Sequence, residues 1–267
     1  MARVSVSQAW EESRRIFTHD GGLLVSVALA LLVLPDVIAG VVAPTTETSM
    51  NMGGRALSLI AVFIGVIAQL AIVRLALGPS TTVGQAIGHG FRRFPSTLGA
   101  LLILGLCGMA LAIPLVAVLI AIGAVDMSTG KASGPWPVLA LVAVFLLIAV
   151  KFMLTVPVAS AEQAGPLAIL KRSWRLTNGN YAVMLGLELL LLVLAVVLML
   201  AATVVGGTIA NLIGGDVSPY SLSALVLALF VGIAQAVLTV LVSVMLARIY
   251  AQLAGRDAAV SVPSSGT

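Results

Sequence analysis

Six long runs of apolar residues, separated by short polar segments, set the pattern of this chain. The runs cover residues 23–42, 56–77, 98–123, 136–160, 181–213 and 221–253. A transmembrane helix needs about 20 predominantly apolar residues, and each run reaches that length. The pattern therefore predicts an all-α integral membrane protein with six transmembrane helices. The last two runs are longer than the bilayer is thick, and Gly206 and Gly207 predict a break in the fifth.

The composition indicates a chain that is solvated by lipid. Of its 267 residues, 60% are hydrophobic and only 9% are charged, and the mean hydropathy is +1.17. Soluble globular domains carry about 25% charged residues, so a water-soluble enzyme is excluded. The N-terminal segment contains Arg3, Glu11 and Arg14 and has no short apolar core followed by a cleavage site. It does not fit a signal peptide, and we expect the first run to be a retained span.

The distribution of positive charge predicts how the chain is oriented. Twelve of the 14 Lys and Arg residues fall on one side of the predicted spans, and only Arg55 and Lys131 fall on the other. By the positive-inside rule, the basic side and both termini are expected to be cytoplasmic. We therefore expect a multi-pass protein of the bacterial inner membrane. Its expected partners are membrane lipids with anionic head groups or another membrane protein, and no nucleic-acid motif is present.

Three basic segments, at 8–17, 85–94 and 167–176, resemble one another when Ala9, Ala86 and Ala168 are aligned. Each segment carries a bulky apolar residue eight positions after the alanine, and a pair of spans follows each. The pattern predicts three repeats within a single transmembrane domain over 1–267. The repeats cover 5–77, 82–160 and 165–253, and a flexible C-terminal tail is expected at 254–267.

Each basic segment is predicted to form an amphipathic helix at the membrane interface. In the first, one face at helical spacing contains Trp10, Ser13 or Arg14, and Phe17. Ser5 with Gln8 can cap its start, although Ser7 competes for this role. Two roles remain open for the segments. One is simple membrane anchoring, and the other is a lipid head-group site. The candidate head-group contacts are Arg92, Arg93, Lys171, Arg172 and Arg175.

Ionisable residues inside the apolar runs are the next candidates, because such charges are costly in a bilayer and usually mark partners or water. Arg74, Lys151, Glu188 and Arg248 all belong to the basic half of their spans. We predict that Glu188 lies near one or more of the three cations. Three interpretations of these charges remain open. They form a structural ion pair, they line a pathway for a polar substrate or protons, or the cations reach the interface without a specific partner. Asp36 follows Pro35 and marks either a kink or a ligand site.

The sequence contains no recognisable motif of catalytic residues. The two histidines, His19 and His89, both lie in basic segments, and His89 is expected to be exposed. Cys107 lies in an apolar run and is expected to be a packing residue. No nucleophile and base pair, phosphate loop or metal-binding motif is present. We therefore expect no enzymatic activity, no cofactor and no metal.

Residues 152–180 carry a distinctive motif. Its members are Pro157, Glu162, Ser173, Trp174, Thr177 and Gly179. This segment resembles the glycerophosphoryl diester phosphodiesterase membrane-domain family and related bacterial inner-membrane proteins. The 267 residues leave no room for the soluble hydrolase barrel of such phosphodiesterases, so from the resemblance we expect the membrane module without the hydrolase activity. Within the motif, we expect Glu162 to pair with Arg172 or Arg175, and Gly179 to permit the turn into the fifth span.

The sequence favours a non-enzymatic membrane protein that binds or organises lipid or a membrane partner. There are two alternatives. The protein is a transporter of small molecules or lipids, or it is the membrane module of a partner phosphodiesterase. A continuous polar cavity that reaches Glu188 would favour transport, whereas a packed bundle with an open lateral groove would favour lipid binding.

Overall fold

The computed structural model describes residues 5–44, 52–78, 82–126, 131–214 and 217–261. Six of its helices are long and apolar enough to cross a membrane. They are Gly21–Val42, Gly53–Leu77, Val83–Ala121, Trp136–Ala161, Tyr181–Gly214 and Leu222–Gly255. The prediction of an all-α protein with six membrane spans is confirmed. The chain is a multi-pass membrane protein.

The first part of the chain forms one side of a helical bundle. It consists of α1 (Val6–His19), α2 (Gly21–Ala28), the π-helix η1 (Leu29–Val33), α3 (Leu34–Val42) and α4 (Met52–Leu77). Ser5 caps α1, because its hydroxyl accepts a hydrogen bond from the backbone N–H of Gln8 at 3.3 Å, as predicted. Buried leucines, valines and alanines of η1, α2 and α4 pack against α10 and form one core of the bundle.

The second basic segment is not a separate helix. It forms the start of α5 (Val83–Ala121), which begins at a capping box between Thr82 and Gln85 and continues through Pro95 into the third span. The prediction of an interfacial helix distinct from the third span, which was expected at 98–123, was therefore wrong for this segment. Gly90 lets this part of α5 approach α4, since a Cβ atom there would lie 2.8 Å from the carbonyl oxygen of Ile67.

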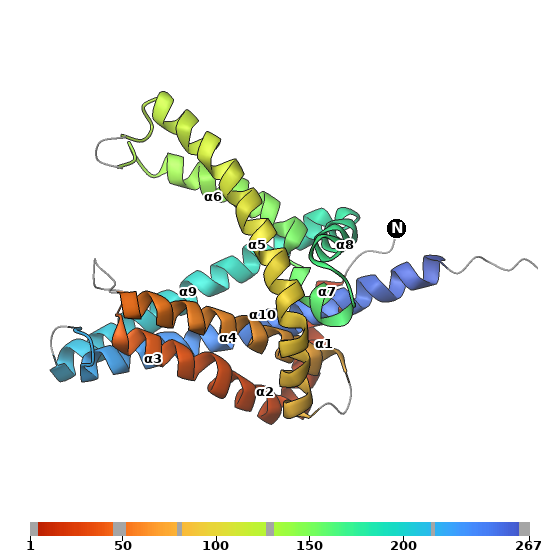
Figure 1. The fold of residues 1–267 in the computed structure, drawn as a ribbon, viewed down its shortest axis with the longest axis horizontal. Helices are drawn as coiled ribbons and strands as arrows, with labels where there is room; N and C mark the ends of the chain where they lie inside the picture. The colour runs from red at the N-terminus through yellow and green to blue at the C-terminus, as the bar shows by residue number, and fades with distance from the viewer. Residues whose placement is uncertain (1–4, 45–51, 79–81, 127–130, 215–216, 262–267) are drawn as a thin grey trace, which may run out of the picture.

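The chain then returns through α6 (Trp136–Phe152) and α7 (Thr155–Ala161), followed by α8 (Pro166–Asn178). Figure 1 shows the hairpin of α5 and α6 diverging from the other spans, and its outer half is exposed, with Leu106 at 66% and Ile113 at 64%. The helix α8 lies against the inner ends of α5 and α6 and against α7. A second core joins α7, α8, α9 and α10.

The last hairpin consists of α9 (Tyr181–Gly214) and α10 (Leu222–Ser261), which pack along much of their lengths. The break predicted at Gly206 and Gly207 was wrong, because α9 runs through both residues. Gly206 instead allows close packing, since a Cβ atom there would lie 2.8 Å from Cβ of Phe230 on α10. The helix α10 continues to Ser261, so residues 254–261 of the predicted tail are helical.

We call the end of the bundle that carries α1, α7 and α8 the basic end, and the opposite end the far end. The backbone N–H of Tyr220, before α10, donates to the carbonyl of Val41 in α3 at 2.9 Å. This bond ties the two hairpins together at the far end.

Candidate functional site

The motif of residues 152–180 builds a compact junction at the basic end. The fourth span is interrupted after Phe152, where Pro157 in the next turn has no N–H to donate. Two hydroxyls satisfy the carbonyls at the interruption. Thr155 Oγ1 donates to the carbonyl of Phe152 at 2.6 Å, and Ser173 Oγ on α8 donates to the carbonyl of Lys151 at 3.0 Å. Ser173 thereby fixes α8 to the end of α6.

Glu162 connects α8 to α10. Its Oε1 atom accepts from Arg172 Nε at 2.9 Å and from the hydroxyl of Tyr250 at 2.9 Å. The predicted pair between Glu162 and Arg172 is present in the structure. Sequence reasoning missed Tyr250, because it lies 88 residues further along the chain and carries no local motif.

Lys151 is held by residues within and directly after the segment 152–180, and not by Glu188. Its Nζ atom donates to Asn178 Oδ1 at 2.6 Å and lies 5.1 Å from the ring centre of Trp174 and 4.7 Å from that of Tyr181. The hydroxyl of Tyr181 in turn donates to the carbonyl of Leu147 at 2.8 Å. A side-chain acceptor and two aromatic faces thus hold the ammonium group at the basic end of α6.

Glu188 lies at the inner wall of an apolar groove of about 660 Å³ between α5, α6 and α9. Within the described residues it forms no ion pair with Arg74, Lys151 or Arg248, and its buried Oε2 atom has no hydrogen-bond partner. The structural ion pair, one of the interpretations left open for Glu188, is therefore not formed among the described residues. Lys151 instead contacts Asn178 and the two aromatic rings.

The groove opens sideways, toward the surroundings of the bundle. Its floor reaches Leu170 of α8 and Phe152 of α6, and its rim includes Cys107 of α5 and Val142 of α6, both of which are exposed. Cys107 was predicted to be a packing residue, but its side chain is exposed. Glu188 is the one ionisable carboxylate among the described residues that line this groove.

The other predicted cations are distributed around the basic end. Arg74 is exposed, and Arg248 is half-buried with an Nε atom that has no hydrogen-bond partner. Arg248 lines a shallow pocket with Glu12 and Asp20 beside α1. These two arginines and Glu188 therefore do not converge on one site.

The predicted head-group residues differ in how accessible they are. Arg92, Lys171 and Arg175 are exposed, and Arg93 is half-buried. The side chain of Arg172 is only 18% exposed because it faces Glu162. Arg172 thus serves the junction between helices, and Lys171, the residue after Leu170 on α8, is exposed.

Two further predictions at this end were wrong. His89 is half-buried instead of exposed, and its Nε2 atom lies 2.8 Å from the carbonyl oxygen of Ser160. Gly179 adopts an ordinary right-handed conformation, with φ −80°, so the turn into α9 does not need a glycine.

The comparisons with known proteins place the chain in a family without assigning it an activity. No curated protein matches the chain, and no solved structure matches it. The resemblance to the glycerophosphoryl diester phosphodiesterase membrane domain therefore has no relative to support it. Residues 4–253 match the model of the family described as domain of unknown function DUF7847, and the chain belongs to that family.

Proposed function

We propose that this protein binds a membrane lipid, with an acyl chain in the groove between α5, α6 and α9 and the head group at the basic end. The observation that carries the proposal is the groove itself. It is apolar apart from Glu188, has a volume of about 660 Å³ and opens sideways along the membrane spans. Ligand pockets typically measure about 300 to 1,000 Å³, so this space suits a lipid chain.

The basic end of the groove supplies partners for a phosphate-bearing head group. Lys171 follows the groove residue Leu170 and is exposed, and Trp174 on the same helix is 46% exposed. Tryptophan and lysine at this depth are typical of residues that contact lipid head groups. The junction through Ser173 and Glu162 holds α8 firmly, so these side chains are presented from a fixed helix.

Glu188 gives the groove one polar contact. Its Oε2 atom lacks a protein partner, and an intramembrane carboxylate of this kind often marks a functional position. Transport of a polar solute would require a continuous polar cavity at Glu188, but the walls of the groove are leucine, valine, phenylalanine and other apolar side chains. The groove therefore favours a lipid over a polar substrate.

The location that fits this function is the bacterial inner membrane, with the basic end facing the cytoplasm. The excess of Lys and Arg at that end supports this orientation. Anionic lipids are then the expected partners, because the basic end lies where their phosphates are.

Native mass spectrometry of the protein, extracted with its own lipids, tests the proposal. Gly108 lies in the groove, and a Cβ atom there would meet only Phe145 Cε1 at 3.7 Å, so a larger side chain would grow into the space. Gly108→Phe is expected to remove the bound lipid. Gly105→Phe, on the same helix but outside the groove lining, is the matched control, since a Cβ atom there meets nothing within 4 Å.

The wild type and Gly105→Phe should retain bound lipid of one class, and Gly108→Phe should lose it. Gly105→Phe and Gly108→Phe should have similar melting temperatures. Equal retention of lipid by all three proteins would rule out the groove as the binding site. A Lys171→Ala variant that retains lipid but no longer prefers an anionic class would place the head group beside α8.

A further inference from the structure

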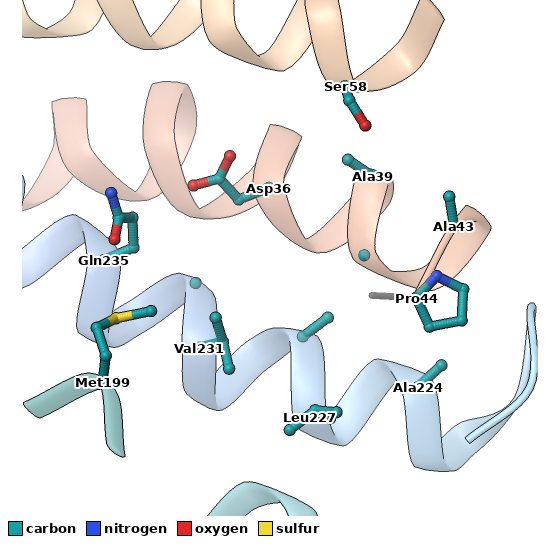
Figure 2. Close-up of a pocket in the computed structure, with 13 residues that line it drawn as sticks. Asp36, Ala39, Ala43, Pro44, Ser58, Met199, Ala224, Leu227, Val231 and Gln235 are labelled. Atoms are coloured by element: carbon teal, nitrogen blue, oxygen red, sulfur yellow. The ribbon is translucent and has the colours of Figure 1, made fainter. Parts of the chain in front are cut away.

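A second internal space lies in the far half of the bundle, away from the groove. Two adjoining cavities, of about 270 and 380 Å³, meet at Asp36 between α3, α4 and α10. Figure 2 shows Asp36 on α3, with Ser58 projecting from α4 and Gln235 from α10 on either side. All three residues line both cavities. Asp36 lies six residues before the end of α3 at Val42, about 9 Å into the span.

The cavities contain polar groups that have no partner among the described residues. Gln69 and Thr239 line the second cavity beside Asp36 and Gln235. Within the described residues, none of these four side chains makes a hydrogen bond or an ion pair. Polar groups at membrane depth are expensive unless water or a ligand satisfies them. Their convergence from three helices on one space indicates a binding site.

The backbone next to Asp36 is irregular in a way that often accompanies such sites. The turn before Pro35 widens into the π-helix Leu29–Val33, and π-helical turns are frequent where a helix bears functional residues. Leu31 and Leu32 of this turn line the second cavity, directly before the Asp36 turn. Pro35 has no backbone N–H to donate within the helix, and the wider turn directly precedes it and Asp36.

The charge balance defines the class of ligand. The described residues that line the two cavities include one carboxylate, that of Asp36, and no lysine, arginine or histidine. The remaining polar groups offer amide and hydroxyl oxygens, which suit hard cations. A single carboxylate neutralises a monovalent cation, whereas calcium and magnesium sites use several acidic groups or retained water.

We infer that Asp36, with Gln69, Gln235 and Thr239, binds a small monovalent cation within the membrane. The first cavity reaches Ala43 and Pro44 at the end of α3, so the cation enters from the far end. This site is separate from the lipid groove and does not depend on the proposed function. Alkali cations and a small protonated amine share the required charge, and the test distinguishes them.

Dicyclohexylcarbodiimide, which modifies protonated carboxyl groups in membranes, provides the test. The purified protein is treated in choline chloride, sodium chloride, potassium chloride or methylammonium chloride at equal concentration, and the label is located by peptide mass spectrometry. A cation at ten times its dissociation constant leaves about one site in eleven free, so labelling at Asp36 should slow roughly tenfold. The described residues that line the groove around Glu188 offer no other side-chain oxygen, so its labelling should be equal in all four salts.

Saturable protection of Asp36 by one of the three small cations supports the inference and identifies the source of the charge. Equal labelling of Asp36 in all salts, with equal melting temperatures in all salts, overturns it. The melting temperature of the wild type should rise with the protecting cation, and that of Asp36→Asn should not. Thr239→Val should weaken the protection, whereas Thr208→Val, whose hydroxyl bonds only the carbonyl of Val204 in its own helix, should leave it unchanged.

Discussion

The hydroxyl of Tyr250 donates to Oε1 of Glu162 at 2.9 Å, and so joins the last helix to the turn between α7 and α8. The same oxygen accepts from Arg172. One carboxylate therefore sets the position of α8 relative to both α7 and α10, and through α8 it sets the floor of the groove at Leu170.

Replacing Tyr250 with phenylalanine should loosen this connection while preserving the packing of the ring. A hydrogen bond to a charged partner contributes about 1.5 to 3 kcal/mol when buried, and since Glu162 is 32% exposed we expect about 1 kcal/mol. Denaturation in a series of dodecyl sulfate concentrations measures the change. Tyr220→Phe is the control, because that side chain is 75% exposed. Equal stability of the two variants would show that the Tyr250 hydroxyl does not hold α10.

Ser173 should be needed for the interruption between α6 and α7. Its fully buried hydroxyl caps the carbonyl of Lys151, so Ser173→Ala leaves that carbonyl without its side-chain donor and should lower the free energy of unfolding by about 1 kcal/mol. Ser26→Ala, which removes a bond to Gly22 within one helix, should have a smaller effect. The same denaturation assay compares them, and a larger loss from Ser26→Ala would contradict this role.

The two adjacent glycines of α9 should respond differently to alanine. Gly206→Ala forces a Cβ atom against Phe230, and overpacking of this kind costs about 1 to 3 kcal/mol. At Gly207 an added Cβ atom meets nothing within 4 Å, so Gly207→Ala should be neutral or slightly stabilising. Melting temperatures in detergent check the pair. If both substitutions destabilise equally, the glycines act as the hinge that the sequence suggested and not as a packing contact.

The sequence predicted the spans well because the length of an apolar run reports directly on crossing a bilayer. The spans of the structure end close to the predicted ones, except where the start of α5 joins the third span. That difference arose because the apolar run begins only at Leu98, whereas the helix also includes the basic segment before it and passes through Pro95, which a long helix tolerates.

The candidate site was only partly predictable. The Glu162 and Arg172 pair lies within ten residues and follows from a local motif. Asn178 and Trp174 lie in the same segment and Tyr181 follows it directly, but nothing in the sequence indicated that Lys151 would contact these residues and not Glu188. Contacts between distant helices depend on which helices are neighbours, and periodicity does not determine this.

The cavity at Asp36 illustrates the same limit. Gln69, Gln235 and Thr239 are visible in the sequence as polar residues within apolar runs. Each one alone is unremarkable, and only the packing of α3, α4 and α10 brings them to Asp36. The neighbouring Pro35 was the one local signal at this position.

Occupancy of the groove is the central claim, and the native Cys107 on its rim measures it most directly. The protein is purified in detergent with its own lipids, labelled at Cys107 with a benzophenone maleimide and irradiated, and the adducts are identified by mass spectrometry. In a Cys107→Ser background, Leu106→Cys carries the same probe one residue away, outside the groove lining and 66% exposed. Lipid adducts from Cys107 and none from position 106 are the predicted result. Equal adducts from both positions, or none from Cys107, would contradict a lipid bound in the groove.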